Sequence, residues 1–214
     1  MRAIKLISLF AATLGSLPLR AQPASPAGPP ANLATNRPLY MTDVKRVGGP
    51  GLITADFAYV TFGTNKFGFA MPGGFRLETE DAQKVTLVSA DLNCLLTFRV
   101  VEPLPPGATE LDPAPYRDLV ISRRRGGKIL EEFSLGAVGR HGPAFDLRWN
   151  AAGSVPRRER VLFIPSNAGV LEFSVVSSLE KFEAGRQGFH ALLLTFRIAG
   201  ADGRLAMPMF SDRL

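Results

Sequence analysis

The sequence is poor in the side chains that form disulfides and metal centres. Its 214 residues contain one cysteine, Cys94, and two histidines, His141 and His190. A single thiol cannot form an internal disulfide, and the two histidines are far apart with no metal-ligand spacing. Cys94 alternates with Leu96 and Phe98 on an apolar face, which indicates a small buried side chain and not a nucleophile. We expect no metal and no other cofactor.

The common catalytic motifs are also missing. The chain contains no glycine-rich phosphate loop and no Gly-x-Ser-x-Gly elbow. The segment Ser178–Lys181 has the Ser-x-x-Lys spacing of penicillin-binding enzymes, but the companion motifs of those enzymes are absent. We therefore expect no catalytic residues. The alternative is an envelope hydrolase with a site around Ser178, Lys181 or His190.

The first residues have the three parts of a secretory signal. Arg2 and Lys5 form a short positive region, and Leu6–Leu19 is an almost uncharged apolar run. This run of about 14 residues is shorter than the roughly 20 that span a bilayer. We expect a cleaved signal peptide over residues 1–21, no transmembrane anchor after cleavage, and a periplasmic or secreted protein. The preferred cut follows a small residue, Ala21, with Ala24 and Ala27 as alternatives.

The basic charge of the whole chain depends on this leader. Arg2, Lys5 and Arg20 belong to it, and no acidic residue comes before Asp43. Without the leader the chain has 22 basic and 19 acidic residues, a net charge of +3 instead of +6. This modest charge does not favour nucleic acid as a partner.

The rest of the chain divides into a tether and one domain. Residues 22–38 are rich in Pro, Ala, Gly and Asn and carry too little apolar surface to fold, so we expect a flexible tether. Residues 39–214 are enough for a single globular domain with a sizeable core.

Several segments have the patterns of β-strands. Phe57–Phe62 and Phe67–Met71 flank a turn cluster and predict a hairpin. Val85–Asp91 and Cys94–Val101 follow as two strands. In the second strand the apolar face described above alternates with a mixed face, which consists of Leu95, Thr97, Arg99 and Val101.

A helix is predicted after these strands. Asp112 is a good N-cap, Pro113 suits the first helical position, and Gly126 can end the helix. Strands are then expected at 129–138, with a break near Gly136, and at 144–151, 160–165 and 170–176. In the strand over 144–151, Asp146 alternates with apolar residues and is expected on the more polar face.

The final helix is indicated by its apolar spacing. Its core face consists of Phe189, Leu192, Leu193 and Phe196. Ser177 and Glu180 have the spacing of a capping box, and Gly185 and Gly188 predict an interruption. The whole pattern predicts an α+β domain with an antiparallel sheet of five to seven strands.

The chain resembles the PsbP/Mog1-like superfamily over residues 67–198. The segment Phe67–Phe75 is similar to the opening strand of that family, the order of elements agrees, and Leu194–Ile198 is similar to its closing helix. The resemblance implies a central antiparallel sheet covered by helices, an α/β/α sandwich. It also implies an accessory, binding or assembly protein, and it offers no shared catalytic residue.

Two clusters of arginines are candidate binding residues for an anion or a partner: Arg123, Arg124 and Arg125, and Arg157, Arg158 and Arg160. If the fold brings both clusters to one end, they form a patch that attracts phospholipid or an acidic protein surface. The favoured alternative is two solvated loops whose charges are balanced by nearby acids: Glu131, Glu132 and Glu159.

These observations favour an exported, non-catalytic accessory or binding domain of the bacterial cell envelope. Its partner is expected to be a protein or a small ligand. A second possibility is a carrier that holds an apolar ligand between sheet and helix. The fifteen phenylalanines could line such a cavity, although they more readily explain a packed core.

Overall fold

The computed structural model describes residues 40–47, 55–78, 84–104, 108–124, 126–199 and 205. The chain divides into two compact units, Met1–Thr35 and Asn36–Leu214, and all described residues belong to the second unit. The expected signal peptide, residues 1–21, and tether, residues 22–38, therefore lie outside the described residues.

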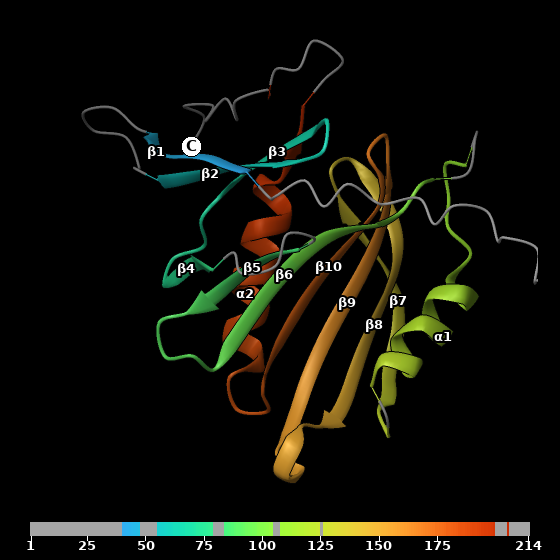
Figure 1. Ribbon diagram of the computed structural model, residues 1–214. Helices are drawn as coiled ribbons and strands as arrows, with labels where there is room; N and C mark the ends of the chain where they lie inside the picture. Colours follow the sequence, from blue (N-terminus) through green and yellow to red (C-terminus); the bar gives the residue numbers. More distant parts are fainter. Residues whose placement is uncertain are drawn as a thin grey trace, which may run out of the picture. The chain divides into compact units, whose positions relative to one another are not determined.

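The described residues are mainly β-structure, with two α-helices and one short 3₁₀ turn, η1 (Figure 1). The early strands are β1 (Tyr40–Val47), β2 (Ala55–Phe62), β3 (Asn65–Ala70), β4 (Phe75–Glu78), β5 (Val85–Ser89) and β6 (Cys94–Glu102). The later elements are α1 (Pro113–Arg123), β7 (Lys128–Ala137), β8 (Arg140–Asn150), η1 (Ala152–Ser154), β9 (Pro156–Ser166), β10 (Gly169–Ser178), α2 (Phe182–Thr195) and β11 (Arg197–Ile198).

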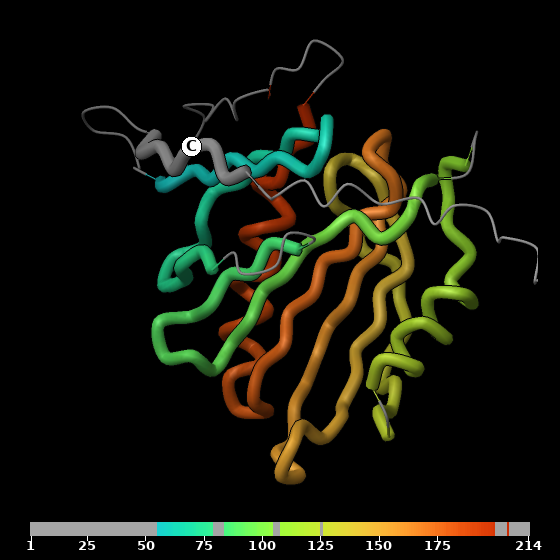
Figure 2. Tube along the Cα trace, in the orientation of Figure 1, coloured from blue at the N-terminus to red at the C-terminus, as the bar shows by residue number. Residues whose placement is uncertain are grey.

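Seven strands form one antiparallel sheet in the order β4-β5-β6-β10-β9-β8-β7. Strands β7 to β10 follow one another through hairpins, as the trace in Figure 2 shows. β10 then pairs with β6, about 75 residues earlier in the chain. The predicted strand pattern is confirmed, but β7 continues through Gly136, and its irregularity lies at Ile129–Glu131 instead.

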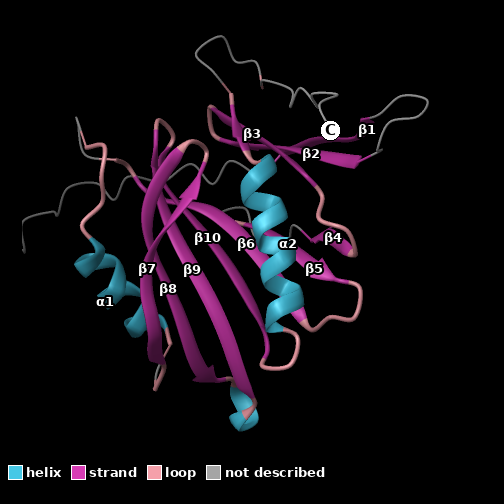
Figure 3. Cartoon of the chain, turned by 180° about the vertical axis from the view of Figure 1, so that it is seen from behind, coloured by secondary structure: helices cyan, strands magenta, loops and turns pink. Residues whose placement is uncertain are grey.

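Helix α2 packs across one face of this sheet (Figure 3). The four predicted core residues of α2 and its C-terminal end are buried: Phe189, Leu192, Leu193 and Phe196. The predicted capping box is wrong, because α2 begins after Lys181, and no side chain caps it. The predicted interruption is also wrong: the helix runs continuously through Gly185 and Gly188. A Cβ at Gly185 would lie 2.6 Å from the Cys94 Sγ atom, so glycine lets the helix approach the sheet closely.

Helix α1 packs on the opposite face and begins as predicted. The Asp112 carboxylate accepts a hydrogen bond from the backbone N–H of Ala114 at 3.0 Å. Tyr116 and Val120 are buried against the sheet, and the Tyr116 ring lies 4.5 Å from that of Phe163. Burial and the hydrogen bond to Glu102 raise the pKa of Tyr116.

A second, four-stranded sheet has the order β1-β2-β3-β11. The predicted hairpin forms its centre, since β2 pairs with β3. Phe67 and Phe69 of β3 pack against Phe98 of the large sheet, with ring centroids 5.8 and 5.6 Å apart. This aromatic cluster joins the small sheet to the α2 face of the large sheet.

The coarse fold prediction is confirmed: an antiparallel sheet carries one helix from the middle of the chain and one from near its end. The protein is richer in β-structure than expected, because a second sheet accompanies the first. The finer description, an α/β/α sandwich, stays a prediction, because the described residues form two sheets and only two α-helices.

Replacing Gly185 by alanine is expected to destabilise the fold. The new Cβ would collide with Cys94, and overpacking typically costs about 1–3 kcal/mol, partly offset by the roughly 1 kcal/mol helix preference of alanine. We expect a net loss of about 1 kcal/mol in the free energy of unfolding, measured by urea denaturation. In a Cys94→Ala background the same change should cost less. An equal cost in both backgrounds would contradict this close contact.

Candidate functional site

The six candidate arginines do not form one patch. Arg123 and Arg124 lie at the end of α1, on the α1 face of the large sheet. In β9, Arg158 and Arg160 alternate with Glu159 and point to the opposite face, because they pair with Arg148 and Asp146 of β8. Two candidates remain: Arg157 pairs with Trp149 on the α1 face, and Arg125 lies outside the described residues.

Arg158 and Arg160 form a buried ion cluster with Asp146. The Arg160 guanidinium donates to both carboxylate oxygens of Asp146 at 2.6 and 2.9 Å, and Arg158 donates to one at 3.3 Å. Asp146 is fully buried, although it shares its strand face with the polar residues Arg148 and Asn150. The arginines also stack on aromatic rings, Arg158 on Phe182 and Arg160 on Phe133. These contacts join α2 to the sheet and link the edge strand β7 to β9, which is a structural role.

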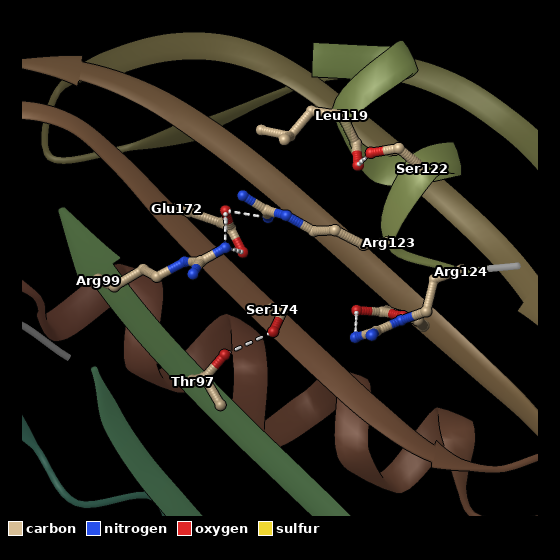
Figure 4. A network of polar contacts seen from close by, with 9 residues as sticks. Thr97, Arg99, Leu119, Ser122, Arg123, Arg124, Glu172 and Ser174 are labelled. Carbon is tan, nitrogen blue, oxygen red and sulfur yellow. Dashed lines mark hydrogen bonds and ion pairs between the residues drawn. The ribbon is translucent and has the colours of Figure 1, made fainter. Parts of the chain in front are cut away.

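The α1 face carries a groove between the end of α1 and strands β6, β10 and β9. Its volume is about 510 Å³, and arginine side chains enter it from β6 and from α1 (Figure 4). We call it the Arg99–Arg123 groove after the two arginines that meet over its floor. Cavities of this size are typical of small-ligand sites.

Two guanidiniums in this groove share one carboxylate. Arg99 Nη2 donates to both oxygens of Glu172 at 3.1 and 3.0 Å, and Arg123 Nη1 donates to Glu172 Oε2 at 2.6 Å. The Glu172 side chain is 10% exposed, whereas those of Arg99 and Arg123 are 34% and 29% exposed. This trio carries one excess positive charge. Each guanidinium has five N–H donors, so donors beyond those bound to Glu172 remain.

Local structure explains this convergence. The register of β6 and β10 places Arg99 directly opposite Glu172. Arg123 occupies the last turn of α1, where a cation also interacts favourably with the helix dipole. Sequence alternation had already placed Arg99 on the mixed face, but Glu172 is 73 residues away and could be assigned to the site only from the strand pairing.

The ion pair of Arg124 with Glu159 forms one wall of the groove and carries no net charge. The Nε and Nη2 atoms of Arg124 donate to Glu159 at 2.6 and 2.8 Å, and the Arg124 guanidinium lies 4.7 Å from the centre of the Trp149 ring. Hydrogen bonds from Arg124 to Glu159 raise the pKa of Arg124. For Arg124, the positive charge is therefore balanced by Glu159, as the favoured alternative in the sequence analysis expects. Glu132 pairs instead with Arg117.

The residues of the hydrolase hypothesis do not come together. Lys181 is the N-cap of α2, and its Nζ lies 3.9 Å from a carboxylate oxygen of Asp91. His190 is nine residues further along the helix, a rise of about 13 Å. Burial, Arg160 and Arg186 lower the pKa of His190. No hydrogen bond joins Ser178 Oγ to either side chain in the described part of the chain.

Cys94 is the packed thiol that the sequence predicts. It is 4% exposed, and burial raises its pKa to about 11. Ten of the fifteen phenylalanines are among the fully buried side chains of the described residues. The rings on the α2 face lie in mutual contact, such as Phe98 and Phe196 with centroids 4.9 Å apart. Phenylalanine therefore mainly fills the core between sheet and α2, although Phe196 and Phe75 each also border a hollow beside α2, of about 550 and 540 Å³.

Two negative findings apply to the described residues only. None of their helices has the length and hydropathy needed to cross a membrane. They contain no group of three or more His, Cys, Asp or Glu side chains arranged to hold a metal ion.

No protein-family model and no curated protein matches the chain. Among solved structures it is similar to cyanobacterial PsbP (CyanoP) from Synechocystis, with a TM-score of 0.48 and 12% identity over 71% of this chain and 98% of that one. It is also similar to LpqN of Mycobacterium tuberculosis, a protein involved in cell envelope biogenesis. There the TM-score is 0.40 and the identity 12%, over 63% of this chain and 83% of that one. A PsbP structure, of the family that the sequence resembles, is thus among the structures to which the chain is similar.

Removing the charge of Asp146 is expected to destabilise the protein strongly. Asp146→Asn would leave Arg160 buried without a counter-ion, which typically costs about 3–5 kcal/mol. Glu132→Gln is the matched control, because it breaks a bidentate arginine pair whose side chains are 42% and 31% exposed. Such surface pairs contribute about 0–1 kcal/mol. Urea denaturation of both variants checks the contrast; similar small losses would argue against a buried anchor.

Proposed function

We propose that this protein is an exported, non-catalytic binding domain of the cell envelope, and that the Arg99–Arg123 groove binds an anionic group of its ligand. The arginines that we assign to binding are Arg99 and Arg123. Arg124, Arg158 and Arg160 have structural roles in this proposal.

The observation that carries the proposal is the sharing of Glu172 by Arg99 and Arg123. A carboxylate held between two guanidiniums leaves one positive charge uncompensated, in a groove of about 510 Å³. A guanidinium is planar, permanently charged and well matched to the paired oxygens of a carboxylate or phosphate. The partial burial of both arginines strengthens such contacts, since fewer water molecules compete for them.

The hydroxyl groups beside the two arginines favour the same interpretation. Thr97 Oγ1 and Ser174 Oγ lie 2.6 Å apart on the groove floor (Figure 4). One hydroxyl donates to the other, so the second keeps a donor for an anion. Fixed arginines together with hydroxyl groups form a pre-organised donor surface.

Anion binding should depend on Arg99 and Arg123 together. Inorganic phosphate and acetate are suitable probes for isothermal titration calorimetry with the purified protein. The double variant Arg99→Gln, Arg123→Gln is expected to bind the better probe at least about tenfold more weakly. Arg117→Gln is the control, because Arg117 also lies in α1 but pairs with Glu132. If neither probe binds the unchanged protein, or if the double variant binds equally well, this function is wrong.

Export should depend on the apolar run of the leader. Residues 1–38 fused to an alkaline phosphatase that lacks its own signal should give enzyme activity outside the cytoplasm, and deletion of residues 6–19 should abolish it. N-terminal sequencing of the exported protein should begin at Gln22 if cleavage follows Ala21. Activity that survives the deletion would contradict a secretory signal.

A further inference from the structure

The floor of the Arg99–Arg123 groove changes from charged to apolar along its strands. Three cross-strand pairs of β6 and β10 form this floor, in the order Arg99 with Glu172, Thr97 with Ser174, and Leu95 with Val176. From the first pair to the last the strands advance four residues, or about 13 Å. A ligand lying along the strands therefore meets guanidiniums first, then hydroxyl groups, then aliphatic carbon.

The apolar end of the groove is unusual for its place in the sheet. Leu95 is 39% exposed, although β6 is an interior strand with β5 and β10 on either side. Val176, opposite it, is only partly buried. Large exposed apolar side chains that lie together often mark a site that contacts a partner or ligand.

Large apolar side chains are also exposed in the loops at this end of the sheet. The loops β5–β6, β8–β9 and β10–α2 all leave the sheet at this end, because Cys94 pairs with Ser177 and Asn150 pairs with Pro156. Each of these loops exposes a large apolar side chain: Leu92 at 64%, Val155 at 44% and Leu179 at 38%.

The charges beside the apolar end cancel. Glu159 of β9 pairs with Val176 of β10, on the edge of β10 that faces away from β6. Its carboxylate is bound by Nε and Nη2 of Arg124, and its side chain is only 4% exposed. Of the arginines that line the groove, Arg99 and Arg123 carry the excess positive charge and lie at the other end. Arg157 is also on the α1 face, but it lies beyond Glu159 and outside the groove lining.

We propose that the ligand is an anionic amphiphile, a carboxylate or phosphate head group joined to an aliphatic chain. The head group lies between Arg99 and Arg123, and the chain runs over Leu95 and Val176 toward the exposed loops. This inference rests on the proposed function, to which it adds the ligand class and the direction of binding.

A series of probes with one chain length separates the contributions of head group and chain. The probes are dodecanoate, dodecyl phosphate, dodecyl maltoside and dodecyltrimethylammonium, each kept below its micelle concentration and titrated calorimetrically into the purified protein. Acetate and inorganic phosphate serve as head groups without a chain. We expect dodecanoate or dodecyl phosphate to bind at least about tenfold tighter than the corresponding head group without a chain. It should also bind at least about tenfold tighter than dodecyl maltoside and dodecyltrimethylammonium.

The two anionic amphiphiles also distinguish the possible sources of the ligand. Tighter binding of dodecyl phosphate would indicate a phospholipid head group, and tighter binding of dodecanoate would indicate a free fatty acid. Either result supports an anionic amphiphile. Equal binding of the neutral maltoside would overturn the role of charge, and chain-independent binding would overturn the role of the apolar end.

A substitution at Leu95 tests the direction of binding. Leu95→Asn should weaken the better anionic amphiphile about tenfold and leave its chainless head group unchanged. Leu194→Asn is the control, because Leu194 is an exposed leucine of α2, on the opposite face. Circular dichroism checks that both variants fold. Unchanged amphiphile binding in a folded Leu95→Asn variant would overturn the assignment of the chain to this end.

The outcomes separate this inference from the proposed function. If acetate or phosphate binds through Arg99 and Arg123 but the chain adds nothing, the ligand class is wrong and the anion site stands. If no anion binds at all, both are wrong.

Discussion

The pairing of β6 with β10 is the interaction on which the rest of the structure depends. It joins strands from the two halves of the chain, with Phe98 opposite Phe173 and Arg99 opposite Glu172. The two phenylalanines contribute to the core beneath α2, while the arginine and glutamate lie on the α1 face. One set of backbone hydrogen bonds therefore determines both the largest aromatic cluster and the charged groove, because neighbouring residues of a strand point to opposite faces.

Features set by neighbouring residues could be predicted from the sequence. The β2–β3 hairpin, the alternation of β6, the Asp112 cap and the core face of α2 follow from local spacing, and the structure confirms them. Features set by distant partners could not. The burial of Asp146 depends on Arg160 of the next strand. The continuity of α2 through Gly185 depends on its close approach to Cys94, 91 residues earlier.

Arginine has a structural role in this protein and a second, proposed role in binding, and position in the sequence does not distinguish them. Arg158 and Arg160 are two residues apart, point the same way and are held by the buried Asp146. Arg123 and Arg124 are adjacent in the sequence, yet Arg124 is bound through its Nε–Nη2 edge to Glu159, while Arg123 gives Glu172 a single terminal nitrogen. What separates Arg124 from Arg123 is how much of the donor edge is already used.

Glu172 acts as an internal anion in the proposed site. It holds Arg99 and Arg123 in position before any ligand arrives, so binding requires little reorganisation of their side chains. The same carboxylate repels an incoming anion and already occupies some of the N–H donors of both arginines. Charge attraction therefore contributes only the difference between the contacts of the arginines with the ligand and their contacts with Glu172. The aliphatic chain must then supply much of the affinity. In the proposed site, the resident carboxylate would therefore favour ready exchange of the ligand.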